Sequence, residues 1–166
     1  MLILSNNNSK LISLYKKIVV AVDGSEPSNR AIDHAAELAE KFNAGLILVT
    51  VYQKRALPTF PAGEPDNEVI LDPDIYEKYW DSIRTMYEKA LLDAETKMQQ
   101  DYPLVKYKTK LKEGRPSATI IKAAEELEAD LIVIGSRGRG GVTGWILGST
   151  SRNVVEKCTK PILVIK

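Results

Sequence analysis

The chain has 166 residues, of which 44% are hydrophobic and 27% are charged, and its formal net charge is +1. This length and composition are typical of one globular domain with a buried core. The near-zero net charge gives no global field that attracts nucleic acid or a membrane surface, so we expect neither as a partner. Cys158 is the only cysteine, which excludes an intrachain disulfide and fits a reduced, cytoplasmic location.

The first residues are predicted to lie outside the main fold. Residues 1–4 are apolar but too few for a signal-peptide core or a membrane span, and the polar run 5–9 interrupts them. We therefore predict an N-terminal extension over residues 1–15 and a single domain over residues 16–166.

The first part of this domain alternates between strand and helix patterns. A buried-strand pattern over 18–22 is followed by helical apolar spacing over 28–42, with Gly45 as the expected stop, and by a second apolar strand over 46–52. Residues 53–74 contain four prolines and are predicted to form a long surface loop.

A long amphipathic helix is predicted over 76–100, with one face against the core. This face carries Tyr76, Tyr79, Ile83, Tyr87, Ala90, Leu91, Ala94 and Met98. Residues 105–112 then alternate lysine with other residues, which is typical of a half-exposed strand whose charges discourage edge-to-edge pairing.

The last third of the chain repeats the alternation. A helix is predicted over 116–127, a strand over 131–134, a helix over 149–157 and a strand over 161–165. Alternating elements with continuous apolar strands predict an α/β fold, a single five-stranded parallel sheet with helices on both faces. In such sheets ligands bind beyond the carboxyl ends of the strands, where the strand order reverses.

The segment from Gly135 to Ser151 carries the strongest functional signal. A glycine-dense loop joins an apolar strand to a helix that begins near Gly148. Glycines let backbone N–H groups close around an anion, and a helix N-terminus directs further N–H groups and a positive dipole end at the same point. The pattern predicts a phosphate site, although it is neither a P-loop nor the dinucleotide fingerprint.

Asp23 directly follows the first strand and allows two interpretations. Its carboxylate accepts ribose hydroxyls or helps to hold a phosphate-bound metal, or else it caps or turns the chain before the next helix. Arg137 and Arg139 also allow two interpretations: their side chains clamp a phosphate, or they are solvated charges of the loop. His34 lies within a predicted helix with no implied partner, and it is predicted to be structural or exposed rather than catalytic.

Several segments together resemble the universal stress protein family. They are Val22-Asp23-Gly24-Ser25, the motif Gly135-x2-Gly138-x9-Gly148-Ser149, and the runs at 48–51, 114–116 and 160–164. The resemblance covers roughly residues 16–166, so it identifies the predicted domain as similar to a universal stress protein domain.

The resemblance implies the strand order 3-2-1-4-5, a homodimer, and the subclass that binds ATP. Carried over by position, the residues for adenine and ribose are Ala21, Val22, Asp23, Val51 and Ile134. Those for ribose and phosphates are Gly135, Arg137 and Gly138, and those that hold the phosphates are Gly148, Ser149, Thr150 and Ser151. The implied ligand is ATP with Mg²⁺ or Mn²⁺, where the ion is held mainly by the phosphates and Asp23 is a candidate metal ligand.

We expect an ATP-binding universal stress protein in which the nucleotide is mainly a regulatory ligand of a stress response. Two alternatives stay open: a slow ATP hydrolase or nucleotidyl-transfer enzyme on the same fold, and an interaction module that has lost nucleotide binding. Against the enzyme, the sequence lacks the His-x-Gly-His and Ser-Gly-Gly-x-Asp-Ser motifs of related α/β enzymes, and no catalytic base and metal set is evident. No catalytic residue is assigned.

The implied strand order also predicts where two copies meet. The third and fifth strands become the sheet edges, of which the third is guarded by lysines whereas residues 162–165 carry no charge. A two-fold axis makes the fifth strand self-complementary in antiparallel pairing. We therefore expect a homodimer through residues of about 160–166, and a protein partner beyond this is not identified.

Overall fold

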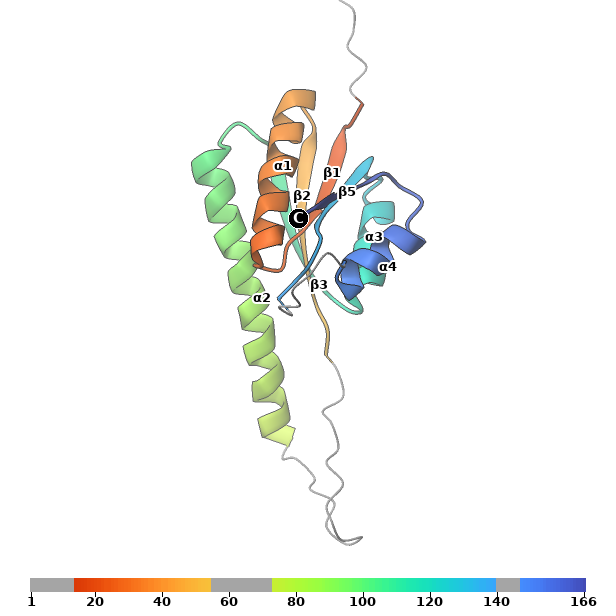
Figure 1. Cartoon of the computed structure of the whole chain (residues 1–166). Coiled ribbons are helices and arrows are strands. Elements are labelled where there is room, and N and C mark those ends of the chain that lie inside the picture. Colours follow the sequence, from red (N-terminus) through yellow and green to blue (C-terminus); the bar gives the residue numbers. More distant parts are fainter. Residues whose placement is uncertain (1–13, 55–72, 140–146) are drawn as a thin grey trace, which may run out of the picture.

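The computed structural model describes residues 14–54, 73–139 and 147–166, and Figure 1 shows their arrangement. Five parallel strands form one sheet in the order β3-β2-β1-β4-β5, which confirms the predicted fold and strand order. The strands are β1 (Lys17–Ala21), β2 (Gly45–Tyr52), β3 (Tyr107–Glu113), β4 (Leu131–Gly135) and β5 (Ile162–Ile165). The helices are α1 (Glu26–Phe42), α2 (Pro73–Asp101), α3 (Pro116–Glu126) and α4 (Ser149–Lys157).

Helices cover both faces of the sheet. Helices α1 and α2 lie on one face, and α3 and α4 lie on the other (Figure 1). The central strands are buried on both sides, so their successive residues supply two separate cores. In β1, Ile18 and Val20 pack toward α1 and α2, while Val19 packs toward α3 and α4. This explains why the central strands read as continuous apolar runs.

Helix α1 begins two residues before the predicted Ser28 and ends at the predicted Phe42, but its C-cap is Asn43 and not the expected Gly45. Ser25 is the N-cap, because its Oγ accepts the Ser28 N–H at 3.3 Å, and Glu26 and Pro27 fill the first turn. The helix stops at Asn43, which adopts a left-handed conformation with φ 51°, so Gly45 is free to begin β2.

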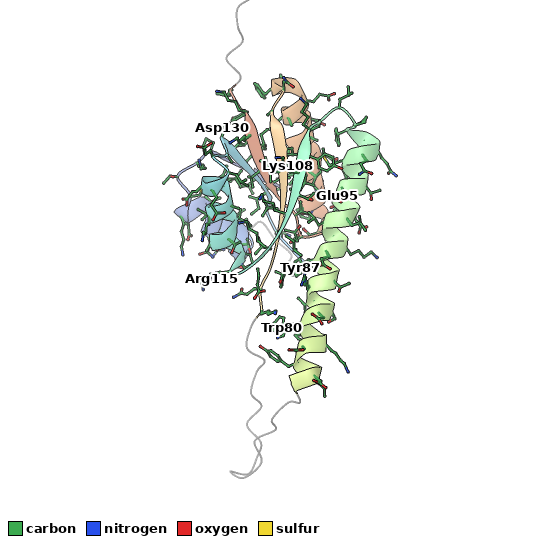
Figure 2. The ribbon with its side chains drawn as sticks, turned by 180° about the vertical axis from the view of Figure 1, so that it is seen from behind. Trp80, Tyr87, Glu95, Lys108, Arg115 and Asp130 are labelled. Atoms are coloured by element: carbon green, nitrogen blue, oxygen red, sulfur yellow. The ribbon has the colours of Figure 1, made fainter. Side chains whose placement is uncertain are left out.

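Helix α2 differs more from its prediction. It begins at Pro73, within the predicted loop 53–74, and its first turns extend beyond the sheet (Figures 1 and 2). The C-terminal half packs on the core as expected. Tyr76 and Tyr79 do not, because the sheet ends before it reaches them, and they are 37% and 45% exposed. Both rings instead meet the buried Trp80 edge-on, with centroids 6.0 and 5.1 Å away.

The two sheet edges are the predicted ones. Strand β3 begins at Tyr107, later than the predicted 105, because the Val105 N–H donates to the Tyr102 carbonyl in a turn. Lys108 on β3 is exposed, while Tyr107 and Leu111 pack against the core. At the opposite edge, β5 is partly buried, and among the described strands it pairs with β4 alone.

Parts of three predicted segments lie outside the described residues, namely 1–13 of the predicted extension, 55–72 of the predicted proline-containing loop and 140–146 of the glycine loop. Within the described part, the ring of Tyr15 packs edge-on against Phe42 at 5.2 Å between centroids. Among helices in residues 14–54, 73–139 and 147–166, none combines the length and the apolar character that crossing a membrane requires.

Candidate functional site

A cleft of about 630 Å³ lies at the carboxyl ends of the central strands. It opens where the strand order reverses between β1 and β4, the position at which open α/β sheets bind ligands. Its volume falls within the range of small-molecule sites. Every residue that the family resemblance assigned to the site lines this cleft: Ala21, Val22, Asp23, Val51, Ile134, Gly135, Arg137, Gly138, Gly148, Ser149, Thr150 and Ser151.

Asp23 occupies a tight turn between β1 and α1. Its Oδ1 accepts the Ser25 N–H at 3.0 Å, and its own N–H donates to the buried Ser28 Oγ at 3.1 Å. The turn interpretation of Asp23 is therefore observed, although the helix cap itself is Ser25. The second carboxylate oxygen, Oδ2, is directed toward Gly138 on the opposite wall of the cleft.

Two glycines of the motif are explained by close approaches within the protein. A Cβ at position 135 stands 2.8 Å from the Pro27 carbonyl carbon and from the Ser28 nitrogen, so only glycine lets β4 end against the first turn of α1. A Cβ at position 138 stands 2.5 Å from Asp23 Oδ2. These glycines bring the β4–α4 loop and the β1–α1 turn together. The Ser25 Oγ adds a direct link by donating to the Arg137 carbonyl at 3.3 Å.

The N-terminus of α4 forms the polar end of the cleft. Gly148 is its N-cap and supplies no side-chain cap hydrogen bond. The first N–H groups of a helix have no intrahelical partner, so those of Ser149, Thr150 and Ser151 are available to an anion. The Ser151 hydroxyl is not, because it is buried and directed at the Ser136 carbonyl at 2.7 Å. Any ligand contact of Ser151 is thus expected from its backbone.

The opposite end of the cleft is apolar. Val49 and Val51 on β2, Ile134 on β4 and Ile120 on α3 line it, and all four are buried. They belong to the core between the sheet and helices α3 and α4. A flat apolar ring fits such a surface, whereas a charged group does not.

Three arginines line the cleft, Arg137, Arg139 and Arg152. Arg139 Nη1 donates to the Asp23 carbonyl at 3.3 Å, and its guanidinium carbon lies 5.8 Å from the centre of the Tyr87 ring. Asp23 is the one carboxylate among the described lining residues. The three arginines and single carboxylate of the described lining residues give the cleft a net positive charge, which matches an anionic ligand.

The cleft contains residues that the sequence interpretation did not assign: Ser28, Val49, Tyr87, Pro116, Ile120, Leu147 and Arg152. The sequence could have indicated Val49 as a cleft residue, because it lies two residues before Val51 and so shares the same face of the strand. Nothing in the sequence indicated Tyr87 as a cleft residue, because its position on the apolar face of a helix predicted only packing against the core.

A divalent cation fits the described residues only as a partner of a bound phosphate. They contain no group of three His, Cys, Asp or Glu side chains that could hold a metal. Asp23 Oδ1 is already bonded to Ser25, which leaves Oδ2 as the single carboxylate oxygen facing the cleft. An oxygen-coordinated ion at this position would need its other ligands from phosphate oxygens and water.

Sequence comparison gives the family. A model of the universal stress protein family matches residues 14–166. The universal stress protein MJ0531 of Methanocaldococcus jannaschii is 32% identical over 157 residues, which cover 93% of this chain and 84% of the relative.

Solved structures agree with this result. UspA from Lactobacillus plantarum is 27% identical with a TM-score of 0.72, covering 92% of this chain and 98% of that one. A universal stress protein in complex with cAMP is 26% identical with a TM-score of 0.61, covering 91% and 96%. The universal stress protein from Archaeoglobus fulgidus in complex with dAMP is 27% identical with a TM-score of 0.57, covering 92% and 99%. With a family model matched over nearly its whole length, this chain belongs to the universal stress protein family.

Proposed function

We propose that this protein binds ATP in the cleft between β1 and β4 and uses it as a regulatory ligand. One observation carries the proposal: an apolar end, a carboxylate and an uncapped helix N-terminus share a single cleft. An adenine nucleotide needs these three environments in the same order, for its base, its ribose and its phosphates.

Each part of the nucleotide has a candidate partner. The faces of the adenine ring fit among Val49, Val51, Ile120 and Ile134, which are apolar and buried. Asp23 Oδ2 is suited to accept the ribose hydroxyls. The phosphates fit the N–H groups at the start of α4, where the helix dipole also favours negative charge.

The solved relatives with cAMP and dAMP support an adenine nucleotide. The choice of the triphosphate rests on the positive charge of the polar end and on the family resemblance. A Mg²⁺ or Mn²⁺ ion bound with the nucleotide neutralises phosphate charge, and Asp23 Oδ2 is the protein oxygen that is suited to reach it.

A regulatory ligand suits the described residues better than a catalytic substrate does. Efficient phosphoryl transfer needs a positioned base and carboxylates that hold the metal. Among the described lining residues, Asp23 is the one carboxylate, and Ser25 already engages half of it. We extend the proposal to a role in a cytoplasmic stress response, which rests on the family, and to a homodimer, which rests on the family and on the partly buried, uncharged edge strand β5.

Analysis of bound nucleotide tests the proposal. The purified protein is incubated with ATP, separated from free ligand by gel filtration and denatured, and the extract is analysed by mass spectrometry. We expect an adenine nucleotide, and incubation with GTP is the matched control. An extract without adenine nucleotide contradicts ATP binding and favours an interaction module that has lost the ligand.

A further inference from the structure

Tyr87 reaches the cleft from a helix outside the glycine motif. It is half-buried and lines the cleft, and Figure 2 shows it on the side of α2 that faces the ends of the strands. The proposed function gives it no role, because the base, ribose and phosphates find their partners on β1, β2, β4, α3 and α4.

A close contact fixes the position of α2 beside the cleft. Gly24 has φ 77°, and a Cβ there would stand 3.0 Å from the Ala90 Cβ. The β1–α1 turn and α2 therefore touch at residues with little or no side chain. Tyr87 lies three residues before Ala90, so the two share a helix face and Tyr87 projects over the same turn.

Tyr87 and Asp23 together hold the Arg139 guanidinium. The ring of Tyr87 lies 5.8 Å from the guanidinium carbon, within the range of a cation–π interaction. The Asp23 carbonyl accepts a hydrogen bond from Arg139 Nη1 at 3.3 Å. The exposed Arg139 side chain is thus held at the cleft by the Tyr87 ring and by the Asp23 carbonyl.

The held guanidinium keeps most of its binding capacity. An arginine carries five N–H donors, and the Asp23 carbonyl engages a donor on one nitrogen. The remaining donors belong to a group that lines the cleft, and their planar arrangement matches the oxygens of a phosphate. Without the Tyr87 ring, the Arg139 side chain would be more mobile in solvent. Nucleotide binding would then cost the conformational entropy of ordering that side chain.

We propose that Arg139 binds a phosphate group of the nucleotide and that Tyr87 is the positioning residue that holds Arg139 ready for it. The Tyr87–Arg139 pair rests on the proposed function, because it acts on the same ligand. It also gives α2 a direct contact with the part of the site that binds charge.

Calorimetric titration with ATP and with adenosine tests the Tyr87–Arg139 pair. We expect Arg139→Gln to weaken ATP binding by roughly 10-fold or more, the range for a hydrogen bond to a charged group. Tyr87→Leu should weaken it by about 2- to 5-fold, the range for an exposed cation–π contact. Tyr87→Phe keeps the ring and should restore ATP affinity. Adenosine carries no phosphate, so its affinity should change in none of these variants.

Two matched controls come from α2 itself. Tyr79→Leu removes an exposed tyrosine, and Arg84→Gln removes an arginine paired with Glu88, both outside the cleft. Both should bind ATP as the unmodified protein does. In the double variant Tyr87→Leu/Arg139→Gln, the loss should equal that of Arg139→Gln alone, since the ring acts through the guanidinium.

Several results would overturn this inference while the proposed function stands. They are unchanged ATP affinity in Arg139→Gln, an equal loss with adenosine, or additive losses in the double variant. If circular dichroism shows that Tyr87→Leu disturbs the fold, Tyr87→Met replaces it, and the exposed Arg139 still tests the pair directly. If the unmodified protein binds no nucleotide, the proposed function fails and the pair fails with it.

Discussion

Asp23 uses its polar atoms in two different tasks. Its N–H and Oδ1 build the β1–α1 turn through Ser28 and Ser25, and its carbonyl accepts from Arg139. Only Oδ2 is directed across the cleft, toward Gly138. The same carboxylate can therefore shape the turn and contact a ligand, which makes the two interpretations of this aspartate compatible.

Asp23→Asn separates these tasks. The asparagine Oδ1 can still accept the Ser25 N–H, so the turn should persist while the charge is lost. We expect nucleotide binding to weaken by about 1–3 kcal/mol, the range for a hydrogen bond that involves a charged group. Calorimetry should show a smaller loss with a 2′,3′-dideoxy nucleotide, because the partner hydroxyls are absent. An equal loss with both ligands would assign Asp23 to the metal or to the turn alone.

Glycine substitutions should divide into effects on binding and effects on stability. Gly138→Val forces a Cβ within 2.5 Å of Asp23 Oδ2, so we expect it to abolish ATP binding and to leave the fold intact. Gly135→Ala forces a Cβ within 2.8 Å of backbone atoms of Pro27 and Ser28, so it should lower the free energy of unfolding by roughly 1–3 kcal/mol. Titration and urea unfolding of both variants measure the two effects.

Gly148 allows a sharper distinction. The sequence alone predicts that Gly148→Val abolishes binding, because the side chain takes the space of the phosphates. A Cβ at this position would instead meet the Arg137 Cα at 3.4 Å and the Ser136 carbonyl at 3.5 Å, which are ordinary contacts. Gly148→Ala should therefore keep ATP affinity within a few-fold. Complete loss in the alanine variant would show that the cleft cannot accept even one methyl group there.

At the scale of elements, the pattern of apolar and charged residues predicted each strand and helix of the described residues and their alternation. The reason is that both faces of the central strands are buried, which leaves an unbroken apolar run in the sequence. The prediction that Tyr76 and Tyr79 pack against the core was wrong, because helical periodicity indicates which face of a helix is apolar but not where the sheet beneath it ends. Tyr87 was missed as a cleft residue for a related reason: its ring contacts the Arg139 guanidinium, and Arg139 is distant in sequence.

The two edge strands differ in what protects them. Strand β3 carries lysines, whereas Ile162–Ile165 is only partly buried and has no charged side chain. An uncharged edge strand is expected to pair with another chain. We predict that β5 pairs with its copy across a two-fold axis, so that Val164→Lys shifts the protein toward monomer in sedimentation experiments while ATP binding is kept.

Thr109→Lys is the matched control for this prediction, because it adds the same charge to the opposite edge strand. It should leave the oligomeric state unchanged. A monomeric unmodified protein at micromolar concentration, or a dimer that survives Val164→Lys, would move the interface away from β5.

At the scale of the whole molecule, the cleft joins segments that are far apart in the chain. The ends of β1 and β4 supply its two walls, α4 supplies its polar end, and α2 reaches it through Tyr87. Because β1 and β4 are neighbours in the sheet, the residues that follow them, Asp23 and Gly138, face each other across the cleft. Residues 140–146 of the glycine loop lie outside the described part of the chain.

Basal ATP turnover should be very slow, well below the median of about 10 per second for enzymes. The physical reason is that the described lining residues supply one carboxylate and no histidine to act as a base or to hold a metal. A phosphate-release assay with ATP and Mg²⁺ measures the rate. A steady-state rate near the enzyme median would make the protein an ATP hydrolase, the alternative that the sequence left open.

The central claim, that the cleft binds ATP, is tested most directly by calorimetric titration of nucleotide-free protein with ATP in the presence of Mg²⁺. We predict a saturable heat with one ATP per chain in the unmodified protein and no saturable heat in Gly138→Val, whose fold is checked by circular dichroism. Absence of saturable binding by the folded, unmodified protein up to millimolar ATP would contradict the account. Equal affinity in Gly138→Val would locate the binding site outside this cleft.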